Sequence, residues 1–282
     1  MYDFGIIGGD IRQMYIAEYL ADAGYSVFCY GVENMDKNNA KNMEEVFEKS
    51  EMIIAPVPYS KDGKNLFLRN SYKRIENWQF ASMIPEKKIV FSGAVGKDIA
   101  RIIREKKGVC HDLLCDDEVE KYNSIATAEG TLAEVIMSHP GFIYGSRCLI
   151  VGYGKCGKTI ADRVAALGAS VTVCARRVEI RIEAMTKGYK AIDFSQLSNN
   201  IEDFEYIFNT VPVMVLDEKV ISNVRENAMI IDIASVPGGA DRAAIEKYGV
   251  NYKHCLGLPG KYCPAALARI YVKQILDSIN KI

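Results

Sequence analysis

The stretch LIVGYGKCGKTIA, residues 149–161, constrains the fold more than any other part of the sequence. An apolar run leads into three glycines, Gly152, Gly154 and Gly157, and an amphipathic stretch follows them directly. A second apolar run, 170–173, comes after it. Glycines in GxGxxG spacing between a strand and a helix are typical of the first turn of a βαβ unit, so we predict such a unit here.

The same alternation of apolar runs and helical patterns fills both halves of the chain. Strand-like runs lie at 2–9, 25–31, 51–58, 87–96 and 108–114, and again at 147–154, 169–175, 204–212, 228–235 and 250–260. Strands that alternate with helices favour parallel sheets with helices on both faces. We therefore predict an α/β fold with two Rossmann-like, doubly wound parallel-sheet domains joined by hinge helices.

The segment between the two halves has a helical pattern of its own. Apolar residues recur at helical spacing over 132–136, and the Pro-Gly pair at 140–141 ends the pattern. Ser124 or Thr127 would cap the start of this helix, and Glu129 would then lie near its first turn. The predicted boundaries are 1–122 for the first domain, 123–144 for the hinge helix, 145–262 for the second domain and 263–282 for a C-terminal helix that packs back on the first domain.

Composition excludes several classes of function. The chain has 282 residues, 49% of them hydrophobic, and a net charge of -1, which argues against nucleic-acid binding and against a membrane-surface role. No apolar run is long enough to span a bilayer, and the first residues lack the basic start of a signal peptide, so we expect a cytoplasmic protein.

None of the eight cysteines forms a CxxC pair. Cys110, His111 and Cys115 lack a second ligand pair, so no metal site is predicted.

The glycine turn at 152–157 is a candidate dinucleotide site. Gly152 would allow the tight turn, Gly154 would let a pyrophosphate approach the backbone, and Gly157 would let helix and strand pack closely. The helix that starts at Lys155 and Cys156 would direct free N–H groups at the phosphates. A tight βα turn without a ligand is the alternative.

Two arginines, Arg176 and Arg177, follow the next strand in place of the acidic residue that usually holds the ribose 2′-hydroxyl. A guanidinium pairs with a 2′-phosphate through its planar fork. We therefore predict NADP(H) rather than NAD(H). The alternative is that both arginines are solvated surface charges.

Three further loops follow strands of the second half and would lie at the carboxyl edge of its sheet. Ligands of open α/β sheets bind at that edge. The loops contribute Asn209, Thr210, Val211 and Pro212 from FNTVP, Ala234 and Ser235 from DIASVPGGAD, and Lys261 from GLPGKYCP. We assign the first two sets to the cofactor and Lys261 to the substrate.

The first glycine turn, GIIGGDIRQ, does not match the dinucleotide fingerprint. Asp10 would repel a diphosphate there and would instead cap the following helix. We therefore assign residues 1–122 to the substrate and 145–262 to NADP, with Asp10, Arg12 and Gln13 facing the substrate. A plain capped helix with a surface Arg12 is the alternative.

Taken together, GGDIRQ, NSIATAEGTLAE, VGYGKCGKTIA, ARR, FNTVP, DIASVPGG and GLPGK resemble the family of the dipicolinate synthase A subunit over essentially the whole chain. The resemblance implies formation of dipicolinate, the calcium-chelating solute of endospores, in the mother cell of a sporulating bacterium. It also implies a flavoprotein-like B subunit of dipicolinate synthase as partner, and an architecture similar to D-2-hydroxyacid dehydrogenases and S-adenosylhomocysteine hydrolase. We expect a homo-oligomer as well.

For such a substrate, a cyclic dicarboxylate, oxidation removes a hydride and a proton. Dihydrodipicolinate is the expected substrate, with hydroxytetrahydrodipicolinate as a second candidate. Arg12 and Lys261 are the candidate carboxylate ligands. Glu129 is the preferred general base, with Asp10 second and Lys261 as a further catalytic candidate. Gln13, Ser92, Gly93 and Thr127 complete the predicted substrate site.

Several alternatives remain open from the sequence. The chain fits another two-domain NADP-dependent dehydrogenase of a carboxylated substrate, or an NADP-binding regulatory or scaffold subunit whose partner performs the chemistry. A hydrolase of the adenosylhomocysteine type would need an acid where Arg176 and Arg177 stand. The three histidines, His111, His139 and His254, do not form the Arg-acid-His set of lactate-type enzymes. We expect His139 to cap a helix and His254 to be structural.

Overall fold

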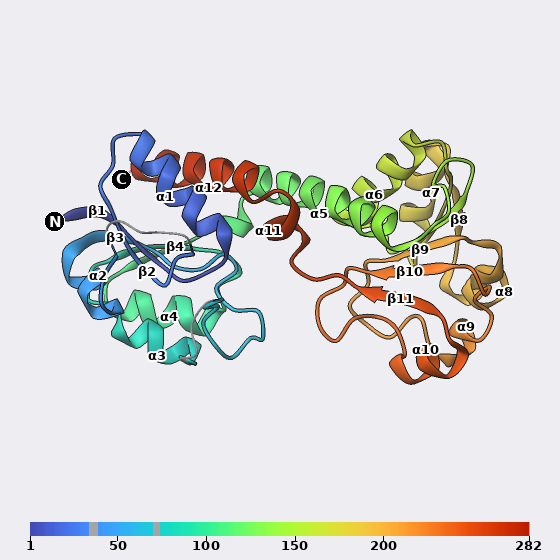
Figure 1. The fold of residues 1–282 in the computed structure, drawn as a ribbon, viewed down its shortest axis with the longest axis horizontal. Coiled ribbons are helices and arrows are strands. Elements are labelled where there is room, and N and C mark those ends of the chain that lie inside the picture. The colour runs from blue at the N-terminus through green and yellow to red at the C-terminus, as the bar shows by residue number, and fades with distance from the viewer. Residues whose placement is uncertain (34–38, 70–73, 282) are drawn as a thin grey trace. The chain divides into compact units, whose positions relative to one another are not determined.

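The computed structural model describes residues 1–33, 39–69 and 74–281, which form two compact units. Unit 1 contains Met1–Asn123 and the C-terminal segment from Cys263, and unit 2 contains Ser124–Tyr262 (Figure 1). Both are layered α/β units built on an all-parallel sheet, so the predicted fold class is confirmed.

Unit 1 is a five-stranded parallel sheet in the order β2-β1-β3-β4-β5. Its elements are β1 (Tyr2–Ile7), α1 (Ile11–Asp22), β2 (Val27–Tyr30), α2 (Met43–Lys49), β3 (Ser50–Ile54), α3 (Asn77–Met83), β4 (Ile89–Ser92), α4 (Lys97–Glu105), β5 (Val109–Asp112) and α12 (Pro264–Ile279). Because β2 and β3 pair with opposite sides of β1, the strand order reverses beside β1. The apolar face of α12 buries Leu267, Tyr271 and Ile275 within this unit.

Unit 2 is a six-stranded parallel sheet in the order β11-β10-β9-β6-β7-β8. Its elements are the greater part of α5 (Asp117–Ser138), then β6 (Arg147–Val151), α6 (Lys155–Ala166), β7 (Ser170–Cys174), α7 (Val178–Thr186), β8 (Lys190–Ile192), α8 (Leu197–Asn200), β9 (Tyr206–Asn209), α9 (Glu218–Ile221), β10 (Met229–Asp232), α10 (Arg242–Tyr248), β11 (Asn251–His254) and α11 (Leu258–Tyr262). This strand order is that of a dinucleotide-binding Rossmann fold, with its reversal between β6 and β9.

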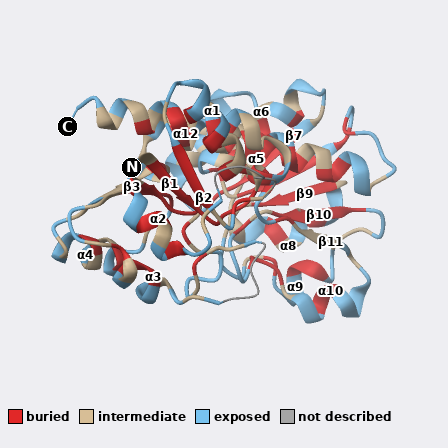
Figure 2. Ribbon diagram, turned by 60° about the vertical axis from the view of Figure 1, so that its left-hand side comes forward, coloured by how far each residue is buried: buried red, intermediate tan, exposed pale blue. Residues whose placement is uncertain are grey.

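The four central strands of unit 2, β10, β9, β6 and β7, are almost entirely buried, as Figure 2 shows for β10, whereas the edge strands β8 and β11 are partly exposed. Neighbouring residues of one strand enter different cores: Ile150 and Ile231 lie in one, whereas Leu149 and Ile230 lie in the other. Successive side chains of a strand point to opposite faces, so helices must cover both faces of this sheet.

Helix α5 begins earlier than predicted. Its first residue is Asp117, and the Asp116 carboxylate accepts hydrogen bonds from the backbone N–H groups of Glu118 at 2.9 Å and Val119 at 3.1 Å. Ser124 and Thr127 are therefore interior to the helix, and the prediction that one of them caps it was wrong. The polar first turns carry no apolar stripe, so periodicity alone missed them.

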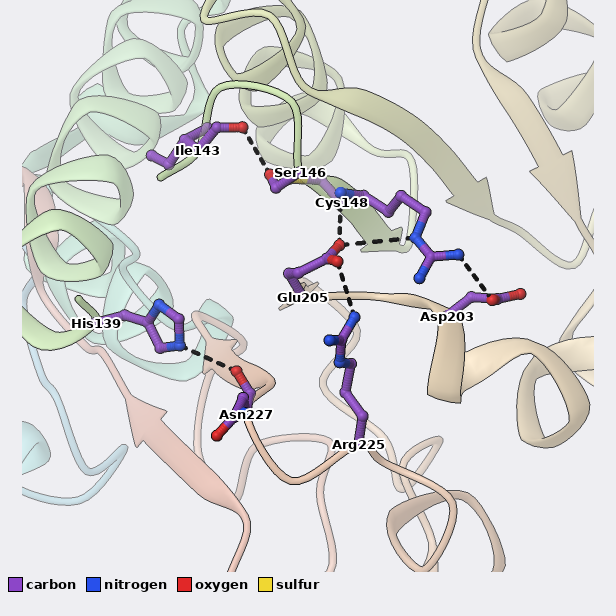
Figure 3. A network of polar contacts seen from close by, with 9 residues as sticks. His139, Ile143, Ser146, Cys148, Asp203, Glu205, Arg225 and Asn227 are labelled. Atoms are coloured by element: carbon purple, nitrogen blue, oxygen red, sulfur yellow. Dashed lines mark hydrogen bonds and ion pairs between the residues drawn. The ribbon is translucent and has the colours of Figure 1, made fainter. Parts of the chain in front are cut away.

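A polar network closes the amino-terminal edge of the unit 2 sheet (Figure 3). The Glu205 carboxylate accepts from the backbone N–H of Arg147 at 2.7 Å and from the Arg225 guanidinium at 2.8 Å. His139 shares hydrogen bonds with the Tyr206 hydroxyl at 2.9 Å and the Asn227 carbonyl at 3.0 Å. His139 therefore ties α5 to the sheet, and these contacts lie at the end of the sheet opposite the glycine turn.

A buried carboxylate, Glu134, fastens α5 to the last elements of unit 2. Its side chain is 5% exposed and lies 2.5 Å from the ammonium groups of Lys253 and Lys261, and it accepts a hydrogen bond from the Tyr262 hydroxyl at 2.8 Å. Burial alone would raise the pKa of Glu134, but the hydrogen bonds from its partners lower it from 4.5 to about 2. The charged carboxylate therefore stabilises the fold.

Replacing Glu134 with Gln should lower the free energy of unfolding of unit 2 by about 1–2 kcal/mol near neutral pH, because two partly exposed lysines lose their shared counter-charge. A depressed acid pKa stabilises the fold above about 4.5, and this contribution is lost as the pH falls toward about 2. Denaturant unfolding of wild type and variant across that window should show the difference shrinking. A constant difference would contradict the role of the charge. Glu179→Gln, in an exposed pair, is the control.

Candidate cofactor-binding site

The glycine turn after β6 has the geometry of a phosphate-binding turn. Gly152 has a φ of 90°, and a Cβ there would overlap the side chains of Thr210 and Val211. A Cβ on Gly157 would overlap the carbonyl oxygen of Gly152. These two positions therefore need glycine for the backbone to fold back on itself.

Gly154 differs from its two neighbours. A Cβ on Gly154 would meet no protein atom within 4 Å. Gly154 is also the N-cap of α6, and no side chain caps that helix. The first N–H groups of the helix thus face space that the described protein atoms leave open, which is the place a pyrophosphate takes in this fold. The residues present fit a dinucleotide.

A cavity of about 680 Å³ opens beside this turn, within unit 2. It is bounded by the loops that follow four strands: Gly152 and Gly154 after β6, Arg176 and Arg177 after β7, Ser195 after β8, and Val211 and Met214 after β9. Such a volume is typical of small-molecule and cofactor sites. The structure therefore brings the glycine turn, both arginines and Val211 together around one space.

Both predicted arginines lie at the rim of the cavity and are exposed. Arg177 is the N-cap of α7, and its guanidinium lies 3.6 Å from Glu179. Within the described residues, the Arg176 guanidinium makes no ion pair, so its charge is available to an anion in the cavity.

A third arginine, Arg181, holds the backbone at this rim, and sequence reasoning missed it. Its guanidinium donates to the carbonyls of Ala175 at 2.7 Å and Arg176 at 2.9 Å, and pairs with Asp193 at 2.8 Å. Arg181 thereby links the loop after β7 to the loop after β8. Its position one turn into α7 was the available signal, because such a side chain reaches back over the preceding turn.

Two predicted cofactor residues do not have side chains in the cavity. Asn209 is fully buried, and its amide donates to Asp232 at 2.9 Å and to the Val211 carbonyl at 3.1 Å. Ala234 is also buried, and its backbone N–H donates to Asp232 at 3.0 Å. Asn209 therefore shapes the loop through a hydrogen-bond network instead of lining the cavity.

The remaining predicted cofactor residues lie around the turn but outside the cavity lining. Thr210 donates from its hydroxyl to the Val151 carbonyl at 3.1 Å, which is a structural contact. Lys155, Cys156 and Gly157 form the first turn of α6, whereas Pro212 and Ser235 are exposed in their loops. Burial raises the pKa of the Cys156 thiol.

The equivalent turn of unit 1 is filled by the protein itself. A Cβ on Gly8 would overlap Leu68, and one on Gly9 would overlap Gln13. Asp10 caps α1 by accepting from the Arg12 backbone N–H, so the predicted capping role is confirmed. Among the described residues, this turn therefore lacks the open space that Gly154 has for a phosphate.

Arg12 is neither a surface residue nor open to solvent. It is 4% exposed, and its guanidinium binds both oxygens of Asp10 at 2.8 Å and donates to the Tyr271 hydroxyl at 3.4 Å. Burial would raise the pKa of Asp10, but the hydrogen bond and charge of Arg12 outweigh it and lower that pKa. The expectation of an accessible Arg12 was wrong, because the pair with Asp10 and the cover of α12 bury it.

Other predicted substrate residues are also engaged inside the protein. The Gln13 amide donates to the Ala55 carbonyl at 3.1 Å, and the Ser92 hydroxyl donates to the Pro56 carbonyl at 2.6 Å. A Cβ on Gly93 would meet Leu114 at 2.7 Å, so this glycine is closely packed. Thr127 is buried in α5 and forms a hydrogen bond with Cys156.

Glu129 is an exposed residue in the middle of α5, so the expected place near a first turn was wrong. The segment that holds Lys261 is the short helix α11 and not the predicted irregular loop, and Lys261 pairs with Glu134. Hydrogen bonding to Glu134 raises the pKa of Lys261.

Within the described ranges, no three metal-binding side chains come together. His254 bonds the Ala234 carbonyl at 2.7 Å, a structural contact.

The strand order of unit 2, its glycine turn and its cavity define a nicotinamide-dinucleotide-binding domain of the dehydrogenase type. Residues 120–238 match the model of the D-isomer specific 2-hydroxyacid dehydrogenase NAD binding domain. Residues 3–114 match the model of the N-terminal domain of the dipicolinate synthase A subunit.

The chain is 30% identical to the dipicolinate synthase A subunit of Bacillus subtilis (strain 168) over 283 aligned positions, which cover 98% of this chain and 95% of the relative. This chain belongs to the family of the dipicolinate synthase A subunit, as the motifs predicted.

Two crystal structures carry the same name. The dipicolinate synthase A subunit from Bacillus halodurans has a TM-score of 0.84 at 26% identity, covering 98% of this chain and 97% of that one. The A chain of dipicolinate synthase from Bacillus subtilis has a TM-score of 0.83 at 28% identity, covering 99% and 96%. The letter in these names implies a partner subunit. None of the described helices combines the length and apolarity that a membrane crossing requires.

Gly154→Ala should mainly reduce dinucleotide affinity, whereas Gly157→Ala should mainly reduce stability. A methyl group on Gly154 meets only open space, so stability should fall by no more than about 1 kcal/mol, while dinucleotide affinity falls because the methyl group obstructs the pyrophosphate. A methyl group on Gly157 overlaps the backbone and should cost about 1–3 kcal/mol of stability or more. Thermal unfolding and NADPH titration of both variants separate the effects. Unchanged affinity in folded Gly154→Ala would contradict this assignment.

Proposed function

We propose that this protein is an NADP-dependent oxidoreductase that forms dipicolinate by oxidising dihydrodipicolinate. The proposed cofactor rests on the cavity of unit 2, which is lined by both the open glycine turn and Arg176. The proposed substrate rests on membership of the family.

The preference for NADP over NAD follows from charge at the rim. The loop after β7 offers two guanidinium groups and no acid, and an acid there would repel a 2′-phosphate. Arg176 has the freer charge of the two, because Arg177 lies near Glu179. Arg181 restrains the Arg176 backbone through its carbonyl oxygen, which limits the ordering needed on binding. Arg176 is therefore the residue we assign to the 2′-phosphate.

NADP bound in this cavity would supply the hydride acceptor, and the substrate ring would lose a hydride and a proton as it becomes aromatic. The protein has to orient the two rings and accept that proton. Glu129 remains our candidate for the base, because its carboxylate is exposed on α5. Asp10 is a weaker base, since Arg12 lowers its pKa. Lys261 is protonated beside Glu134 and suits carboxylate binding better than proton removal.

The second candidate is a regulatory or scaffold subunit that binds NADP while a partner performs the chemistry. The name of the family implies at least one further subunit, which supports this second candidate function. We propose the B subunit of dipicolinate synthase as that partner and a homo-oligomer of this chain as a further assembly. Turnover of dihydrodipicolinate by the purified chain alone would exclude the scaffold role. Turnover only after addition of the B subunit would favour it.

Arg176→Ala should weaken NADPH binding by about 10–100-fold, because one charge-assisted contact with the 2′-phosphate contributes about 1.5–3 kcal/mol. NADH binding should change by no more than about twofold, since that cofactor lacks the phosphate. Fluorescence titration of the purified chain with both cofactors measures this. Arg163→Ala, an exposed arginine of α6 outside the cavity lining, is the matched control. Equal affinity of the wild type for NADPH and NADH would overturn the proposed NADP specificity.

A further inference from the structure

Lys61 lies in the loop after β3. Arg12 was expected to bind a substrate carboxylate in unit 1, but it is buried, and Lys61 is a charged residue near it. Unit 1 has the strand order β2-β1-β3-β4-β5, so its reversal lies between β1 and β3. Ligands of such sheets bind outside the carboxyl ends of the strands at that reversal. The loops that follow β1 and β3 meet at this point. Lys61 belongs to the second of them.

Backbone contacts place Lys61 beside the β1–α1 turn. The Gly9 N–H donates to the Phe67 carbonyl at 2.8 Å, and the Phe67 N–H donates to the Tyr59 carbonyl at 2.8 Å. The Lys61 ammonium lies 3.8 Å from the centroid of the Phe67 ring, a cation–π contact. The ring therefore holds the ammonium next to the turn that carries Asp10.

The described charged groups around Lys61 do not balance its positive charge. Asp10 is paired with Arg12 at 2.8 Å, and Arg69 lies 3.8 Å from Glu33, so each of these pairs is neutral overall. Asp10, Arg12 and Arg69 all act electrostatically on the Lys61 ammonium. Lys61 makes no ion pair with any residue that the structure describes, so the described residues of this corner carry one uncompensated positive charge.

The acid next to Lys61 in the chain does not neutralise it. The Asp62 carboxylate accepts hydrogen bonds from the backbone N–H groups of Lys64 and Asn65, both at 2.8 Å, and from the Asn65 amide at 2.7 Å. These bonds lower the pKa of Asp62 and fix the loop that carries Lys61. The loop is therefore ordered before any ligand arrives, which reduces the entropy lost on binding.

We propose that Lys61 binds a carboxylate group of the cyclic dicarboxylate substrate, at the carboxyl edge of the unit 1 sheet. The inference rests on the proposed function for the identity of the substrate. Lys61 supplies the free positive charge that Arg12 cannot supply, since Asp10 and Tyr271 already occupy the Arg12 guanidinium. The Asp10–Arg12 pair supports the site by holding the start of α1.

The test is equilibrium binding of dipicolinate to the NADP-loaded full-length protein, measured by calorimetry. Lys61→Gln should raise the Kd by about 10–100-fold, because a charge-assisted contact is lost, and Lys61→Arg should restore most of the affinity. Lys64→Ala removes an exposed lysine of the same loop and should leave the affinity unchanged. NADPH affinity, measured separately, should be the same in all variants because the cavity of unit 2 is intact.

A neutral ligand of the same shape separates charge recognition from a structural effect. Pyridine-2,6-dicarboxamide should bind wild type and Lys61→Gln equally, whereas a disturbed site would weaken both ligands alike and overturn the proposal. The salt dependence of dipicolinate binding should also be shallower in Lys61→Gln.

The outcomes distinguish this inference from the proposed function. If wild type oxidises dihydrodipicolinate but Lys61→Gln binds dipicolinate normally, Lys61 is not the carboxylate ligand and the proposed function stands. If wild type, with or without its partner, neither turns over dihydrodipicolinate nor binds dipicolinate, both proposals are wrong.

Discussion

The close contact between Gly157 and the carbonyl of Gly152 is the constraint on which the rest of unit 2 depends. It lets α6 start directly above the end of β6, with its first N–H groups directed at the carboxyl edge of the sheet. The loops after β7, β8 and β9 then surround that point because all six strands are parallel and end at the same edge. The opposite edge is closed by the Glu205 and His139 contacts, so the open cavity and the polar anchors lie at different ends of one sheet.

The two units use one architecture in two chemical ways. In unit 2 the first βα turn is left open, and the rim around it is positive. In unit 1 the same turn is filled by Leu68 and Gln13, and a buried Asp10–Arg12 pair occupies the start of the helix. An ion pair at that depth is stable only because each oxygen of Asp10 and the guanidinium of Arg12 have partners. Among the described residues, a turn filled in this way leaves no room for a diphosphate, so an anion bound beside it has to be bound by side chains of the loops.

Several side chains act on the site without touching the cavity. Arg181 donates hydrogen bonds to the carbonyls of Ala175 and Arg176. The Asp232 carboxylate accepts hydrogen bonds from the Asn209 amide, the Ala234 N–H and the Tyr252 hydroxyl. Such groups fix the shape of loops that would otherwise lose entropy on binding. Glu134 does the same for α11, whose Lys261 it neutralises. The functional loops are thus ordered by buried polar contacts behind them.

The sequence by itself determined the fold class, the glycine turn, the two rim arginines and the family. These are local features, readable from periodicity, from spacing and from the absence of an acid after β7. Tertiary structure alone decided which polar side chains are accessible. Arg12, Asn209 and Ser92 look like ligand-binding residues in the sequence, yet packing between distant segments buries them. Lys61 and Arg181 carry no motif, and only the meeting of separate loops gives them a role. Local sequence specifies hydrogen-bonding capacity, whereas burial and pairing depend on segments far apart in the chain.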